Sequence, residues 1–228
     1  MNSSVIMTLI IIGVGAGIII LSIFFNNKQR LLRNLKKTKA IPVNRAQENQ
    51  YVKLIGKAKH VTEPLNAPLS GRPCVFYQIL VERKGSKNSW HTVIKEIVAD
   101  DFFIETGDEM AIVKMKDSQP VRMVYLVKDH NEHSATFNDA NETVEAYLKN
   151  HGKSSVGFLG LNKTMRYKEG IIEIDETIAV KGVANWKRLS EPIAGYPYSK
   201  ILTLFGTKKQ KLVVTDLPKA TQENKAVR

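Results

Sequence analysis

The sequence predicts a single N-terminal transmembrane helix followed by a β-rich α+β domain of mostly antiparallel strands with one short helix. Three observations predict this class: an uncharged run from Val5 to Phe25, several apolar segments of period two, and one amphipathic segment at 142–150. About 180 residues follow the run, enough for one domain with a hydrophobic core. The predicted division is 1–27 as anchor, 28–49 as basic juxtamembrane linker, 50–217 as folded domain and 218–228 as flexible polar tail.

The apolar run of 21 residues includes eight isoleucines and no charge. At about 1.5 Å per residue it reaches roughly 31 Å, the thickness of a hydrocarbon core. A cleaved signal peptide needs a basic start and a shorter apolar core, so we expect a retained anchor. Gly13 and Gly17 are four residues apart, a spacing that lets membrane helices approach closely. Glycine is common in membrane helices in any case, so a homo-oligomer through Gly13 and Gly17 is kept as the alternative.

The net charge of +12 is concentrated at two ends of the chain, with +7 in residues 26–45 and +4 in residues 206–228. Positive charge beside a span stays on the cytoplasmic side, which predicts an external N-terminus and a cytoplasmic domain. Leu31, Leu32 and Leu35 would let a short helix lie at the membrane surface. No aromatic residue is interleaved with the basic clusters, so nucleic acid is not predicted as a partner. Contacts with the lipid bilayer are expected from Lys28, Arg30, Arg33, Lys36, Lys37 and Lys39.

The body of the chain is typical of strands. Residues 73–82 place Val75, Tyr77, Ile79 and Val81 on one face at period two, 85–89 have the composition of a turn, and 90–98 fit a hairpin partner. The short helix is predicted at 142–150, because Asn141 can cap it and Val144, Tyr147 and Leu148 form one apolar face. Further strands are expected within 111–115, 121–127, 171–174, 177–184, 201–205 and 212–215.

Cys74 is the only cysteine, which excludes an internal disulfide and a zinc site with several cysteines. We interpret it as a small buried apolar residue, with a reactive thiol as the alternative. His130 and His133 are three residues apart beside acidic residues, but 128–141 has the composition of a solvated loop, which we favour over a metal site. Asp100 and Asp101 are adjacent, so they point to opposite faces of a strand and favour a strand-end turn. We predict no catalytic residue, metal or cofactor.

One block of the sequence resembles a known family. Leu54-Ile-Gly56-Lys-Ala58 is followed by Ala67-Pro68-Leu-Ser-Gly71-Arg-Pro73-Cys74-Val-Phe-Tyr77, and then by Trp90. This pattern is similar to the GIDE domain, also called the beside-a-membrane domain, and the similarity covers roughly residues 50–190. Pro68 and Pro73 restrict φ and Gly71 permits a turn between them. Tyr77 and Trp90 are expected to pack in the core or across strands, with ligand stacking as the alternative.

Animal and plant members of this family are mitochondrial and chloroplast membrane ubiquitin ligases of the RING type, and simpler bacterial and archaeal forms are anchored membrane proteins. A RING binds two zinc ions through about eight Cys and His ligands. This chain has one Cys and five His, so it resembles the simpler form. The resemblance implies an interaction or scaffold module at a membrane surface with a protein partner. The alternatives are a ligase-type activity or enzyme subunit, and a sensor of anionic lipid.

Overall fold

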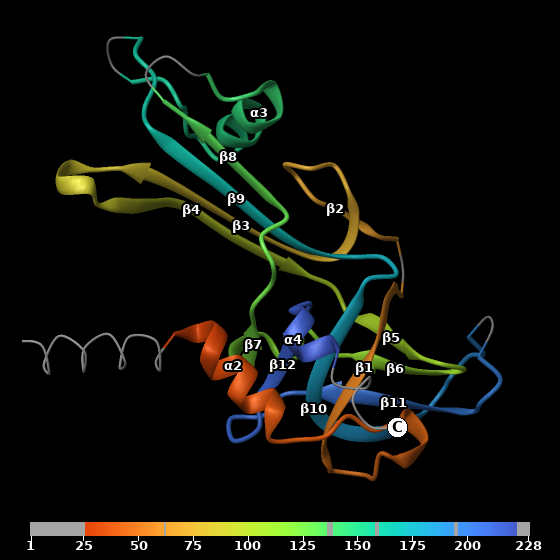
Figure 1. The fold of residues 1–228 in the computed structure, drawn as a ribbon. Coiled ribbons are helices and arrows are strands. Elements are labelled where there is room, and N and C mark those ends of the chain that lie inside the picture. The colour runs from red at the N-terminus through yellow and green to blue at the C-terminus, as the bar shows by residue number, and fades with distance from the viewer. Residues whose placement is uncertain (1–25, 62, 136–138, 158–159, 194–195, 223–228) are drawn as a thin grey trace, which may run out of the picture.

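The computed structural model describes residues 26–61, 63–135, 139–157, 160–193 and 196–222. Its strands form two sheets, and three α-helices lie beside these sheets in the described part of the chain (Figure 1). The first sheet, called here the closed sheet, closes on itself. The second, called here the open sheet, has free edges.

The closed sheet contains five strands that pair in a ring. Each strand pairs with the next, and the last pairs back with the first, so the ring leaves no free edge between its members. All pairs are antiparallel except β6 with β11. In ring order the strands are β1 (Tyr51–His60), β5 (Phe102–Thr106), β6 (Glu109–Val113), β11 (Lys200–Phe205) and β10 (Thr177–Arg188).

The apolar interior of the ring accounts for the alternating apolar residues of its strands. Leu54, Ile104, Val180 and Leu202 come from four different strands, are fully buried and belong to one apolar cluster. Because alternate strand residues point to the same face, a period of two places such residues together inside the ring. Two further strands extend the sheet beyond β10, with β12 (Leu212–Thr215) antiparallel to β10 and β7 (Arg122–Val124) parallel to β12.

The open sheet is built around one long strand. Strand β3 pairs with β9 on one side, and with β4 and the short β2 on the other, while β8 pairs with the far side of β9. Helix α3 (Glu142–Asn150) covers one face through Val144, Tyr147 and Leu148. The strands are β2 (Leu65–Asn66), β3 (Pro73–Lys84), β4 (Trp90–Ala99), β8 (His130–Ser134) and β9 (Met165–Glu173).

The two sheets share one hydrophobic core. Val75 and Phe76 of β3 and Ile172 of β9 pack into the cluster that fills the closed sheet. The chain passes directly between the sheets from β4 to β5 and from β9 to β10. Two helices, α2 (Asn27–Lys36) and α4 (Pro218–Thr221), lie beside β10 and β12, and three 3-10 turns complete the elements: η1 (Val43–Arg45), η2 (Ser86–Asn88) and η3 (Gln119–Val121).

The predicted single-pass membrane class is contradicted and is corrected here. Among the described residues no helix is both long enough and apolar enough to cross a membrane. A span needs about 20 predominantly apolar residues, whereas α2 has 10 residues and includes four bases. The predicted external N-terminus and cytoplasmic domain, inferred from that span, are corrected with it. Of the predicted anchor at 1–27, residues 1–25, with Gly13 and Gly17, lie outside the described residues, and Asn26 and Asn27 cap and begin α2.

The structure confirms some of the other predicted elements and corrects two of them. The β-rich body, the 73–82 and 90–98 hairpin and the helix at 142–150 are confirmed, and the Asn141 side chain accepts the Val144 N–H at 2.8 Å as a helix cap. The loop expected over 128–141 is wrong in part, because 130–134 form β8 by pairing with β9. The tail expected from residue 218 begins as α4, since Leu217 and Ala220 pack against α2.

Candidate anion-binding cleft between the two sheets

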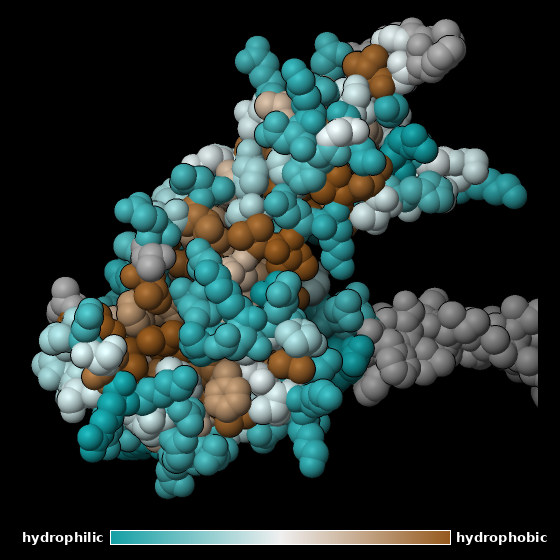
Figure 2. All heavy atoms as spheres, turned by 180° about the vertical axis from the view of Figure 1, so that it is seen from behind, coloured by the Kyte–Doolittle hydropathy of each residue, from teal (hydrophilic) through white to brown (hydrophobic). Residues whose placement is uncertain are grey.

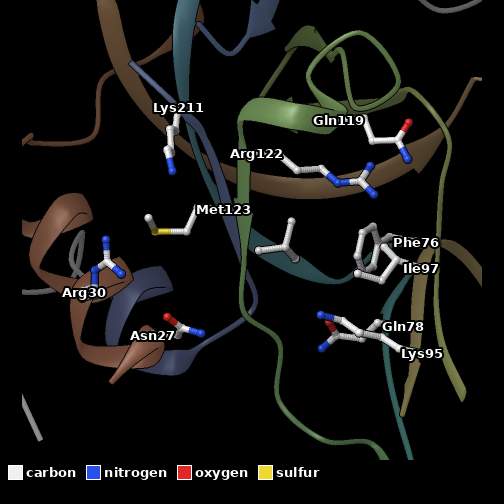
Figure 3. Close-up of a pocket in the computed structure, with 11 residues that line it drawn as sticks. Asn27, Arg30, Phe76, Gln78, Lys95, Ile97, Gln119, Arg122, Met123 and Lys211 are labelled. Carbon is white, nitrogen blue, oxygen red and sulfur yellow. The ribbon is translucent and has the colours of Figure 1, made fainter. Parts of the chain in front are cut away.

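A cleft of about 580 Å³ lies where the open sheet faces α2 and β7. Figure 2 shows the molecule from behind, hollowed between the two lobes, with apolar atoms at the inner end of the hollow. In Figure 3 the side chains from α2 and those from the open sheet lie on opposite sides of β7. The lining consists of Asn27, Arg30, Phe76, Gln78, Lys95, Ile97, Gln119, Arg122, Met123, Val124 and Lys211.

Strand geometry determines which residues of β3 and β4 form one wall of this cleft. Gln78 of β3 pairs with Ile97 of β4, and because strand residues alternate, Phe76 and Lys95 share the face of the sheet on which these two lie. Phe76 is fully buried and forms an apolar floor, whereas Lys95 and Ile97 are exposed at the rim. The opposite face of the sheet is covered by α3, so this is the face left open to the cleft.

Arg122 is the most enclosed cation of the cleft. Its guanidinium lies 6.0 Å from the centre of the Phe76 ring, and one Nη donates a long hydrogen bond of 3.5 Å to the Met115 carbonyl oxygen. Burial lowers the pKa of Arg122. Within the described part of the chain, no carboxylate lies at ion-pair distance from this guanidinium. The fork of N–H donors is therefore only weakly satisfied, although guanidinium groups favour two parallel bonds to a carboxylate or phosphate.

Three further cations line the same cleft: Arg30 from α2, Lys95 from β4 and Lys211 before β12. In Figure 3, Arg30 and Lys211 lie on the other side of β7 from the Arg122 guanidinium. All three are exposed, and none forms an ion pair with another described residue. The eleven lining residues include no Asp or Glu. Like charges that converge on a concave surface with an apolar floor raise the local positive potential and attract anions.

A smaller cavity of about 150 Å³ continues the cleft along β3, β4 and β9. The two cavities share Gln78, Lys95 and Ile97. The continuation adds Leu80, Lys128 and Lys168, whose ammonium is paired with Glu82 at 2.7 Å. Unlike the larger cavity it also includes two acidic residues, Glu96 and Glu169. Together the two cavities form an elongated concave surface, and the larger one has a volume typical of a ligand site.

The block that resembles the GIDE family forms the turn between β2 and β3. The Gly71 N–H donates to the Ala67 carbonyl at 2.8 Å, and Gly71 has φ of 70°, a value that favours glycine. The buried Glu169 carboxylate accepts the N–H groups of Leu69 and Ser70 at 2.8 and 3.0 Å. Pro68 and Pro73 flank this turn, so these residues hold backbone in place and lie outside the cleft lining.

The other residues of the resemblance lie apart from the cleft lining as well. Cys74 is buried, and burial together with the charge of Glu169 raises the pKa of its thiol to about 11. Tyr77 is partly buried, its hydroxyl donates a long bond of 3.4 Å to Glu96, and burial raises its pKa to about 12. The Trp90 ring lies 4.1 Å from the Arg166 guanidinium carbon.

The bases predicted to contact lipid are divided among several environments. Arg30 lines the cleft, and Arg33 and Lys36 line a different cavity of about 580 Å³ beside α4. The Lys28 ammonium lies 5.9 Å from the Tyr125 ring centre, while Lys37 and Lys39 are exposed after α2. The apolar face expected to lie on a membrane is used internally, because Leu31 and Leu35 are buried against β10, β12 and α4.

The residues considered for catalysis are separated. His130 contacts Glu132 at 3.2 Å, but His130 and His133 are three positions apart on β8 and so point to opposite faces. Asp100 and Asp101 lie in the turn between β4 and β5, where each pairs with a lysine. In the described ranges, no group of three or more His, Cys, Asp or Glu residues is arranged to hold a metal ion.

Arg122, Lys95 and Lys211 were not predicted as site residues, because each lies in a different part of the fold and none belongs to a motif. The available signal was only that Arg122 lies between apolar Val121 and Met123 in a predicted strand. No family model, curated protein or solved structure matches the chain. The resemblance to the GIDE family therefore stays a prediction, and the function is inferred from the cleft.

Proposed function

We propose that this protein is a binding module that holds an anionic group, a carboxylate or a phosphate, in the cleft between its two sheets. The observation that carries the proposal is the convergence of four cationic side chains on a lining with no acidic residue. This proposal retains the interaction module expected from the sequence, and it does not depend on a membrane anchor.

The position of Arg122 supports the proposal. Taking a guanidinium partly out of water costs free energy, which a bound carboxylate or phosphate offsets by charge-assisted hydrogen bonds. In a folded protein such a cation is usually paired with an acid, but here the one acceptor among the described residues is the Met115 carbonyl oxygen at 3.5 Å. The enclosed guanidinium is thus suited to orient an anion, while the exposed Arg30, Lys95 and Lys211 are suited to attract it.

The test is isothermal titration of the full-length chain with pyrophosphate and, separately, with the tricarboxylate tricarballylate. We expect Arg122→Gln to weaken binding about 10- to 100-fold, the equivalent of one charged hydrogen bond of roughly 1.5–3 kcal/mol. Lys149→Gln is the matched control, because Lys149 is exposed at the end of α3 and is not part of the lining. Binding of both anions with equal affinity to wild type and Arg122→Gln would refute the proposal.

A further inference from the structure

Strand β4 is an edge of the open sheet. Its only strand partner in the described chain is β3, so the side of β4 that faces away from β3 has no strand beside it. In Figure 1, β4 is the strand of the upper sheet that lies nearest to β7 and α2. An unpaired edge presents a row of backbone N–H and C=O groups that another extended chain can use.

The hydrogen-bond pattern shows which residues present these groups. The Asp100 N–H donates to the Val75 carbonyl at 3.2 Å, and Asp100 and Val75 continue the β3–β4 register. Bonded and non-bonded pairs alternate in an antiparallel ladder. The backbones of Lys95 and Ile97 therefore point away from β3, and their side chains line the cleft.

The opposite wall of the cleft is also a strand edge. Arg122, Met123 and Val124 are consecutive in β7, and all three line the cleft. Consecutive strand residues point to opposite faces, so a cavity that contacts all three runs along the strand edge. Strand β7 has β12 as its only strand partner among the described residues.

We propose that the anionic ligand is an acidic segment of a partner protein, bound in extended form as an added strand along β4. This inference rests on the proposed function. An added strand would pair its backbone with the outward groups of Lys95 and Ile97, and every second side chain would point into the cleft. Glutamate or aspartate at those positions would meet the cations contributed by Arg30, Arg122 and Lys211.

Charge decides between this occupant and a second copy of the chain. Lys95 is exposed on the free edge, and like charges directly opposite each other on paired strands are destabilising. Two β4 edges paired about Lys95 would bring their lysines together, whereas an acidic strand would bring opposite charges together. The same lysine thus disfavours self-pairing and favours an acidic partner.

The experiment uses a fluorescein-labelled octapeptide of alternating Glu and Val, titrated with the full-length protein by fluorescence polarisation. Two isomeric peptides carry N-methyl groups on all Val or on all Glu residues, so their composition and charge are identical. Only one of these sets removes the N–H groups that face β4. We expect one isomer to bind within threefold of the unmodified peptide and the other to bind at least tenfold more weakly.

Pyrophosphate titration of the same protein separates the two proposals. Equal binding of the two isomers, or pyrophosphate binding without peptide binding, would overturn strand addition while the anion cleft stands. Dimerisation in light scattering without peptide binding would assign the β4 edge to a second copy and also overturn it. Failure of pyrophosphate, tricarballylate and peptide together would overturn both proposals.

Discussion

Glu169 illustrates how one buried side chain holds in place a turn that is formed by a distant block of the sequence. Its carboxylate is fully buried in β9 and accepts two N–H groups from the turn between β2 and β3, about 100 positions earlier in the chain. A buried backbone N–H without an acceptor is costly, so the turn and Glu169 depend on each other. The prolines and glycine of the block shape the turn, and Glu169 fixes it to the sheet.

Glu169→Ala is therefore expected to lower the free energy of unfolding by about 2–4 kcal/mol, because the buried Leu69 N–H and the partly buried Ser70 N–H lose a charged acceptor. Glu169→Gln retains one carbonyl acceptor and should lose less. Urea denaturation followed by circular dichroism measures both. Glu191→Ala, at an exposed position, serves as the control. An unfolding free energy of Glu169→Ala within about 0.5 kcal/mol of wild type would contradict this account.

At the scale of elements, α2 shows why a basic, leucine-containing segment was misinterpreted. Its leucines suit a membrane surface and a protein surface equally well, since both bury an apolar face. In the folded protein Leu31 and Leu35 pack against β12 and α4. The Lys181 ammonium donates to the carbonyl oxygen of Asn34 in the last turn of α2 at 2.9 Å, where the helix dipole favours a cation.

Leu35→Ala tests the internal role of α2. Leu35 is 1% exposed, so its truncation should leave a cavity and lower the free energy of unfolding by about 2–4 kcal/mol. Leu32→Ala, at a position that is only partly buried, should cost less. Both are measured by urea denaturation of the full-length chain. Equal stability of wild type and Leu35→Ala would mean that the leucine face of α2 has another role.

At the scale of the whole molecule, closure of the first sheet depends on a close approach between β1 and β5. Gly56 precedes the point at which β1 leaves β10 and pairs with β5. A Cβ atom placed on Gly56 would lie 2.1 Å from the Glu105 carbonyl oxygen and 2.8 Å from its carbonyl carbon. Backbone atoms cannot rotate away as a flexible side chain can, so the glycine is required by the closure of the ring.

Gly56→Ala should consequently separate β1 from β5 and lower the free energy of unfolding by roughly 2–4 kcal/mol, within the range of strongly destabilising substitutions. Faster hydrogen exchange of the β5 amides would locate the damage at this seam. The neighbouring Lys57→Ala is the control, because Lys57 is exposed. If Gly56→Ala exchanged and unfolded like wild type, the close approach would not limit closure.

The features that local sequence predicted and those that it did not predict differ in their physical origin. Local patterns were sufficient to predict the β-rich body, the β3–β4 hairpin and α3 with its Asn141 cap, because apolar periodicity and capping act over a few residues. The order of strands in each sheet was not predictable in this way, since β1 pairs with β10 across more than 100 positions of the chain. Pairing at such separation is decided by packing of the complete core.

The sequence by itself determined that the body is β-rich, where the β3–β4 hairpin and the short capped helix α3 lie, and that a single cysteine leaves no disulfide. It did not indicate β1 or β5, two of the five strands of the ring, and it assigned β8 to a loop. Only the tertiary structure decided that α2 packs inward, that five strands close into a ring, and that Arg30, Lys95, Arg122 and Lys211 face one cleft. Each of these cations lies in a different element, and no local periodicity encodes their convergence. It arises because two sheets share one core, which holds the edges of β4 and β7 on opposite walls of the cleft.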